Sequence, residues 1–263
     1  MSDLLQVQRT GSIETWTLNR PQKRNALDQA MVDALHARLQ VAEQDQSLDC
    51  VVLTGAGDKA FVAGADIAQL RERKAADALV AINASLFDRL ARLHCPTIAA
   101  VKGFALGGGC ELAMACDLRI AADNARFGQP EVKLGIMAAA GGTYRLPALV
   151  GLGMLRELLF TGRIVDAHEA LRIGLVNRVV RSDELIGVAL EIAQEISEAS
   201  SIAVRRTKES LSRLRPGGPE AIAAESAIQA DLFESQDKYD RMDAFLQARR
   251  QRAARRAASQ EKS

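Results

Sequence analysis

Short apolar runs and amphipathic stretches alternate along roughly the first two thirds of this chain. Residues 4–9 and 13–18 are β-prone runs separated by Thr-Gly-Ser, a spacing that predicts a β-hairpin. Asp28 stands just before apolar residues at helical spacing and is typical of a helix N-cap. Residues 50–54 and 97–101 are mostly apolar and bounded by turn or breaker residues, which predicts buried strands.

A long helical stripe lies between those two strands. Its apolar members end just before Pro96 and are Leu79, Ile82, Leu86, Leu90 and Leu93. This spacing predicts one helix. From residue 183 onward the strand signals stop, and residues 184–198 and 201–213 have helical patterns. We therefore expect an α/β core at residues 1–198, followed by an α-helical C-terminal region at residues 199–263.

The composition is that of an ordinary globular protein, with 48% apolar and 25% charged residues and a net charge of +1. Such a balance creates no global field that favours nucleic acids, membranes or acidic ligands. The four cysteines lack C-x-x-C spacing and the three histidines lie far apart, so we expect neither a metal site nor disulfides. The first residues do not resemble a secretory signal, and no apolar run approaches the ~20 residues that cross a bilayer. We expect a cytoplasmic protein without membrane contact.

The end of the chain is basic. Residues 249–263 hold six lysines and arginines against one acid, Glu261. A nucleic-acid arm is one interpretation, but we favour a solvated helix end, because cations are stabilising beside the C-terminal end of a helix dipole. The arginines also lack neighbouring aromatic residues that would stack on bases.

The stretch G-F-A-L-G-G-G-C-E-L-A, at residues 103–113, combines flexible backbone with a carboxylate in an apolar setting. It follows a predicted strand and opens a predicted helix. The first N–H groups of a helix have no intrahelical partner, and the positive end of the helix dipole lies behind them. Glycines at 107–109 let a ligand approach that backbone, so this corner suits a developing negative oxygen close to Glu111. Taken alone, the pattern fits a tight turn with a first-turn acid equally well.

Two further stretches share these features. Residues 60–67 follow the strand at 50–54 and place small residues at a predicted helix start. Residues 127–131 carry a second acid, Glu131, in an apolar context, although a surface loop acid is the simpler interpretation. The chain contains neither a complete dinucleotide-binding glycine motif nor a phosphate-binding P-loop.

In their order and spacing, these stretches resemble the enoyl-CoA hydratase/isomerase (crotonase) family. The matching segments are N-R-P-Q-K-R-N-A-L (19–27), F-V-A-G-A-D-I (61–67), G-F-A-L-G-G-G-C-E-L-A-M-A-C-D (103–117), F-G-Q-P-E-V-K-L-G (127–135), A-G-G-T-Y-R-L (140–146) and T-G-R-I-V-D-A-H-E-A-L-R-I-G-L-V-N-R-V-V (161–180). The resemblance covers essentially residues 4–250. It implies a crotonase-like spiral of repeated ββα units, a C-terminal α-helical trimerisation region, and a homotrimer or a hexamer built from two trimers.

The resemblance also implies how an acyl-CoA substrate is held. The backbone N–H groups of Ala63 and Gly108 would form an oxyanion hole for the thioester oxygen. The residues along the adenine and pantetheine path would be Ala26, Leu27, Ala65, Asp66 and Ile67. Arg24 or Lys59 would meet the CoA phosphates, although a solvated surface cation is the simpler interpretation of each. No cofactor is implied beyond the coenzyme A of the substrate, and no metal.

Both glutamates of the family's hydratase pattern are present, Glu111 and Glu131. Two carboxyl groups around one water fit addition of water across a 2,3-double bond, with Glu111 activating the water and Glu131 protonating C2. The resemblance therefore implies hydration of a 2-trans-enoyl-CoA to a 3-hydroxyacyl-CoA, a step of fatty acid β-oxidation. A 3,2-enoyl-CoA isomerase, an acyl-CoA thioester hydrolase and an RNA-binding relative stay open as alternatives.

One departure from the hydratase pattern bears on the substrate. The family typically has Pro-Gly where this chain has Ala138 and Ala139. The exchange alters backbone freedom beside the expected water site. We expect either a narrowed pocket or a different acyl group.

Overall fold

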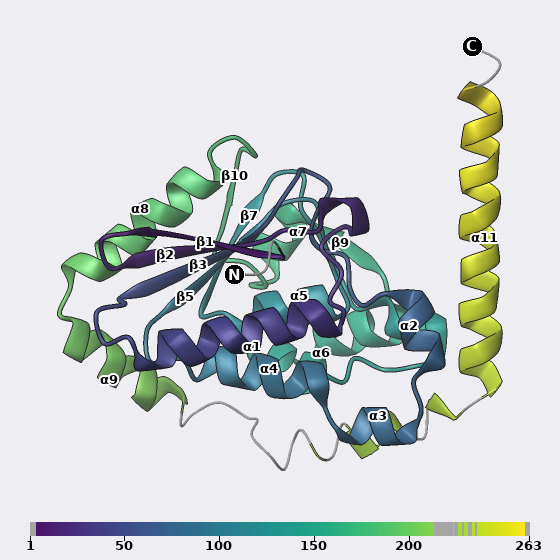
Figure 1. Cartoon of the computed structure of the whole chain (residues 1–263), viewed down its shortest axis with the longest axis horizontal. Helices are drawn as coiled ribbons and strands as arrows, with labels where there is room; N and C mark the ends of the chain where they lie inside the picture. Colours follow the sequence, from purple (N-terminus) through teal and green to yellow (C-terminus); the bar gives the residue numbers. More distant parts are fainter. Residues whose placement is uncertain are drawn as a thin grey trace.

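Two β-sheets with helices around them form the body of the protein, and a long C-terminal helix stands at one edge (Figure 1). The computed structural model describes residues 4–212, 223, 226–227, 229–230, 233–234 and 236–260. Parts of the predicted C-terminal helical region, among them the stretch R-P-G-G-P at residues 215–219, lie outside the described residues.

The larger sheet has six strands in the order β1-β2-β3-β5-β7-β10. They are β1 (Leu5–Thr10), β2 (Ile13–Leu18), β3 (Cys50–Gly55), β5 (Thr97–Val101), β7 (Leu118–Ala122) and β10 (Arg178–Val180). The predicted antiparallel hairpin of β1 and β2 is confirmed, and the other neighbouring strands pair in parallel. Parallel pairing requires crossover connections, which explains why strands alternate with helices along the chain.

The smaller sheet has four strands in the order β4-β6-β8-β9. They are β4 (Ala60–Val62), β6 (Phe104–Leu106), β8 (Arg126–Gly128) and β9 (Ile164–Asp166). Three times along the chain, a strand of the larger sheet leads into a strand of the smaller one and then into helices: β3 to β4, β5 to β6, and β7 to β8. This repetition is the spiral of ββα units that the resemblance implied.

Helices and helical turns fill the connections of this spiral. They are η1 (Pro21–Lys23), α1 (Gln29–Gln44), α2 (Ile67–Glu72), α3 (Ala75–Leu79), α4 (Ile82–Ala91), α5 (Gly108–Ala115), η2 (Pro130–Leu134), α6 (Gly142–Thr161), α7 (Ala167–Arg172), α8 (Leu185–Glu198), α9 (Ser201–Ser212) and α11 (Gln236–Gln260). The predicted N-cap of α1 is confirmed, because the Asp28 side chain accepts a hydrogen bond from the Met31 N–H at 3.0 Å. None of the described helices is long and apolar enough to cross a bilayer.

Both faces of the central strands β3, β5 and β7 are buried, as is usual for parallel strands. Successive side chains of a strand point to opposite faces. Val52 and Ile98 lie in one apolar cluster with residues of α8, whereas Val51 and Ala99 lie in another with residues of α1, α4 and α5. These central strands therefore form the middle layer, with α8 on one side and α1, α4 and α5 on the other.

The prediction of one helix through Leu79 and Leu93 is wrong, because α3 ends at Leu79, and α4 begins at Ile82 and ends at Ala91, before Leu93. Ala81 adopts a left-handed backbone conformation with φ 53°, which interrupts the helical hydrogen bonds between the two helices. Leu79 is 62% exposed, whereas Leu86 and Leu90 are buried as expected. The apolar spacing runs across the break, so the sequence pattern did not reveal it.

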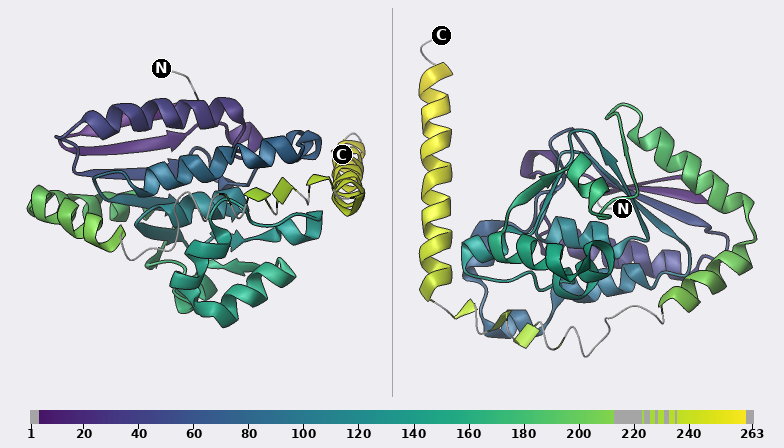
Figure 2. Two further views of the ribbon diagram at one scale, coloured as in Figure 1. Left: turned by 90° about the horizontal axis from the view of Figure 1, so that it is seen from below. Right: turned by 180° about the vertical axis from the view of Figure 1, so that it is seen from behind.

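The first helix beyond residue 198 is fastened to the core by a buried lysine. Lys208 on α9 is only 8% exposed, and its Nζ donates to the Cys95 carbonyl and to Asp117 Oδ2, each at 2.7 Å. Asp117 also accepts from the Thr97 N–H at 2.8 Å, which ties α9 to the start of β5. Farther along, α11 contacts α2 and η2 at the edge of the body (Figure 2). The domain boundary at residue 198 stays a prediction.

We expect Lys208→Met to lower the free energy of unfolding by about 2–3 kcal/mol, because it removes the buried ammonium group that donates to Asp117 and to the Cys95 carbonyl. Urea denaturation followed by circular dichroism measures the loss. The matched control is Arg206→Met on the same helix, whose ion pair with Glu209 lies at the surface and should contribute little. Equal effects of the two variants would contradict the importance of the buried contact.

Candidate active site

Glu111 lies in the first turn of α5 and is only 3% exposed. Its Oε1 accepts hydrogen bonds from the Ala140 N–H at 2.8 Å and the Gly142 N–H at 2.9 Å. These donors belong to the turn that starts α6. A segment about 30 residues later in the chain therefore holds the carboxylate of Glu111 in place. A buried carboxylate needs such partners, because an unpaired charge is costly to remove from water.

Glu131 lies in η2, and the structure brings it close to the glycine turn before α5. A Cβ placed on Gly107 would lie 2.8 Å from Glu131 Oε1, so the carboxyl group occupies the space beside this glycine. With its amide oriented to satisfy its hydrogen bonds, Gln129 donates to both Glu131 oxygens, at 3.1 and 3.2 Å. Glu131 is therefore not the surface loop acid of the simpler interpretation.

The two glutamates differ in their electrostatic surroundings. Burial raises the pKa of Glu111, but the two backbone N–H donors and the nearby Arg145 guanidinium oppose this by stabilising its charged form. Burial and the charge of Glu111 both raise the pKa of Glu131 well above its ordinary value. Of the two, Glu131 therefore has the stronger tendency to hold a proton, and Glu111 has the stronger tendency to stay charged.

Gly108 is the first residue of α5, so its N–H has no partner within the helix. The preceding Gly107 has φ 53°, a left-handed conformation that favours glycine. At the next position, a Cβ on Gly109 would lie 2.0 Å from the Val62 carbonyl oxygen. Gly107 and Gly109 are therefore required by a left-handed turn and by close contact with the end of β4, respectively.

The structure contradicts Ala63 as an oxyanion donor. Its N–H donates to the carbonyl of Arg24 at 3.1 Å and is therefore not available to a substrate. The segment that precedes α1 runs beside the residues after β4, and Leu27 forms a parallel bridge with Ala65. The sequence pattern did not reveal that the N–H of Ala63 is engaged within the protein.

Ala65 has the better orientation. The Gly64 carbonyl accepts from the Leu27 N–H at 3.1 Å, and the described peptide bonds are trans. In a trans peptide the following N–H points opposite to the carbonyl, so the Ala65 N–H points away from Leu27. A Cβ placed on Gly64 would lie 3.1 Å from the carbonyl oxygen of Leu106, the last residue of β6, and β6 leads directly into the glycine turn. The Ala65 and Gly108 donors therefore lie on neighbouring segments.

The predicted substrate-path residues are brought together around this loop. Ala26 and Leu27 are buried next to it, and Leu27 contacts the loop through its backbone. Asp66 caps α2 by accepting from the Ala68 N–H at 2.9 Å, and Ile67 is the first residue of that helix. Their role in binding a substrate stays a prediction.

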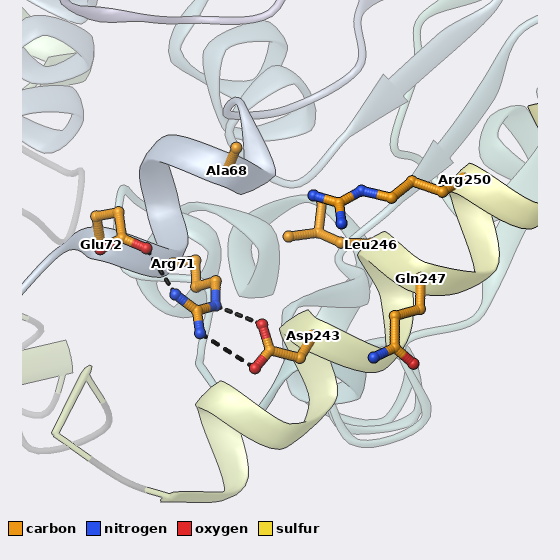
Figure 3. Close-up of a pocket in the computed structure, with 7 residues that line it drawn as sticks. All are labelled: Ala68, Arg71, Glu72, Asp243, Leu246, Gln247 and Arg250. Atoms are coloured by element: carbon orange, nitrogen blue, oxygen red, sulfur yellow. Dashed lines mark hydrogen bonds and ion pairs between the residues drawn. The ribbon is translucent and has the colours of Figure 1, made fainter.

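Two pockets lie near this path. Arg24 and Lys59, the predicted phosphate contacts, line one of about 280 Å³. The other, of about 460 Å³, lies between α2 and α11 (Figure 3). There Arg71 reaches from α2 to Asp243 on α11, with its terminal nitrogen 3.1 Å from Asp243 Oδ2. Neither Glu111 nor Glu131 lines either pocket, so both pockets are separate from the space beside the two carboxyl groups.

Three residues that position the site were not singled out from the sequence. Gln129 is 2% exposed and contacts Glu131. Arg145 donates to the Ala140 carbonyl at 3.0 Å and so supports the turn that holds Glu111. Asn25 is fully buried and donates to the Ala56 and Ala60 carbonyls at 3.0 and 2.9 Å. The sequence hints at these three residues only in that each is a polar residue within one of the matching segments. Among the described residues no cluster of potential metal ligands was found.

The ββα spiral, with Glu111 and Glu131 brought together at the start of α5, defines a crotonase-like α/β protein. The family model for enoyl-CoA hydratase/isomerase matches residues 8–253, and the chain belongs to this family. It is 44% identical to a short-chain-enoyl-CoA hydratase from Clostridium acetobutylicum, over 93% of this chain and 95% of the relative. It is also 44% identical to a crotonyl-CoA hydratase from Syntrophomonas wolfei, over 89% and 91%. An enoyl-CoA hydratase structure from Bacillus anthracis superposes with a TM-score of 0.78 at 36% identity, over 93% and 96%.

Proposed function

We propose that this protein is an enoyl-CoA hydratase, which adds water to a 2-trans-enoyl-CoA to give a 3-hydroxyacyl-CoA. The observation that carries the proposal is the pair of glutamates, a buried Glu111 and a half-buried Glu131, beside the backbone donors at the start of α5. Relatives that share 44% of their residues with this chain over almost their whole length bear hydratase names.

The two glutamates divide the work of hydration. Glu111, the anion, accepts a proton from the water as its oxygen bonds to C3 of the substrate. Glu131, the protonated partner, delivers its proton to C2, so the substrate gains one water overall. Afterwards Glu111 carries the proton, which returns to Glu131 before the next turnover. General acid–base assistance of this kind contributes typically ~10²–10⁴-fold to a rate.

The backbone N–H groups of Gly108 and Ala65 stabilise the intermediate. When water bonds to C3, negative charge moves to the thioester oxygen. Two donors aimed at that oxygen stabilise the enolate more than the substrate, which lowers the barrier. We assign the second donor to Ala65 in place of Ala63, because the Ala63 N–H already binds Arg24.

The rest of the substrate would lie along the loop that the sequence predicted. In this proposal Ala26, Leu27, Asp66 and Ile67 flank the pantetheine and adenine groups of coenzyme A. The proposed chemistry draws its acid, base and oxyanion donors from the chain itself and uses no further cofactor. The trimer or hexamer remains a prediction, and size-exclusion chromatography with light scattering tests it.

The test of the activity is product analysis with crotonyl-CoA. We expect the substrate to gain the mass of one water and to lose its enoyl-thioester absorbance. An unchanged crotonyl-CoA, together with conversion of a 3-enoyl-CoA to its 2-enoyl isomer, would indicate an isomerase. Release of free coenzyme A would indicate a thioester hydrolase. Inactivity towards short, long and branched enoyl-CoAs would overturn the proposal.

A further inference from the structure

Asn83 is a polar residue in an otherwise apolar helical stripe. It lies in the first turn of α4, three, four and seven positions before Leu86, Phe87 and Leu90. Those three residues are at most 2% exposed and belong to the main core. Residue 83 is itself half-buried, and a leucine there would continue the stripe.

The amide also has an unmet hydrogen-bonding requirement. Asn83 Oδ1 is shielded from solvent and has no hydrogen-bond partner among the described residues. Although asparagine at a helix start often caps the first N–H groups, this oxygen accepts from none of them. A buried acceptor without a partner costs about 1–3 kcal/mol, so such a group is expected to find its partner in a ligand or a water.

The location of the Asn83 amide indicates that its partner belongs to, or lies beside, the acyl group of the substrate. A Cβ placed on Gly108 would lie 3.7 Å from Asn83 Nδ2 and 4.0 Å from Leu27 Cδ1. Asn83 and Leu27 thus border the space on the side-chain face of Gly108, whose N–H is the proposed donor to the thioester oxygen. Acyl atoms that extend over this face contact the amide.

We infer that Asn83 is a specificity-determining residue that favours short acyl chains, of about the size of crotonyl, over long apolar ones. This inference rests on the proposed function. A short chain leaves room for a water that satisfies the amide. A long apolar chain covers the amide and displaces that water without replacing its hydrogen bonds, which weakens binding.

The test compares kcat/KM for crotonyl-CoA and trans-2-octenoyl-CoA in the wild type and in Asn83→Leu, which continues the apolar stripe. We expect the octenoyl-to-crotonyl ratio to rise roughly 5- to 100-fold, the range that an unpaired buried polar group predicts. Ser85→Leu, an exposed change on the same helix, should leave the ratio unchanged.

Asn83→Ala separates polarity from size. If both Asn83 variants raise the ratio, removal of the amide is responsible. If only Asn83→Ala raises it, the residue acts by bulk, and the inference is overturned. Equal losses with both substrates would also overturn it, because they would place the amide at the thioester that the two substrates share.

A second measurement separates this inference from the proposed function. Calorimetric binding of butyryl-CoA and octanoyl-CoA requires no turnover, so it remains informative if the wild type hydrates neither enoyl-CoA. We expect Asn83→Leu to improve the affinity for octanoyl-CoA relative to butyryl-CoA. Unchanged relative affinities would count against Asn83 whatever the reaction is.

Discussion

Glu131→Gln is expected to lower kcat by about 10²–10⁴-fold, because an amide cannot deliver a proton to C2. Glutamine has nearly the same shape and can still hydrogen-bond to Gln129, so the substrate site should stay intact. Stopped-flow or steady-state turnover of crotonyl-CoA measures the loss, and calorimetry with butyryl-CoA should show nearly unchanged affinity. Glu184→Gln, at an exposed position, serves as the control.

The pH dependence provides an independent check on the roles of the two glutamates. Burial and the negative charge of Glu111 raise the pKa of Glu131, so activity should fall on the alkaline side as this acid loses its proton. In Glu111→Gln the charge is absent, and the pKa of Glu131 should move down towards its ordinary value. Carboxyl infrared bands of the two proteins report this titration directly. Titration of Glu131 at the same pH in both proteins would contradict the coupling.

Features that depend on neighbours in the sequence were predictable. The hairpin of β1 and β2, the Asp28 cap and the apolar strand at residues 50–54 each follow from a short pattern with a physical cause. The spiral of ββα units followed from the resemblance and not from periodicity. The burial of Glu111 was indicated by the apolar residues around it.

Features that depend on contacts between distant segments were not predictable. Whether the N–H of residue 63 or of residue 65 is free is decided by pairing with residues 24–27, which lie far earlier in the chain. The role of Arg145 depends on the turn before α6 folding back onto α5. Helix α6 was not predicted, because Pro147 and the non-helical Gly151 interrupt the helical spacing of its apolar residues.

Gly108 is the position at which an oxyanion donor can be removed with the least structural change. Gly108→Pro removes one N–H and should lower kcat about 10²–10³-fold relative to Gly108→Ala. Proline is well tolerated at the first position of a helix, where its missing N–H has no intrahelical partner. A Cβ at this position meets only ordinary contacts with Asn83 and Leu27.

The alanine variant is the matched control because both variants carry a Cβ on the substrate face, and the comparison therefore isolates the N–H. Thermal denaturation of the two proteins checks that the proline has not unfolded α5. Butyryl-CoA affinity should fall less than kcat, because the donor stabilises the enolate more than the bound thioester. Equal turnover by the two variants would mean that the Gly108 N–H does not hold the oxyanion, and the start of α5 would then lose its proposed role.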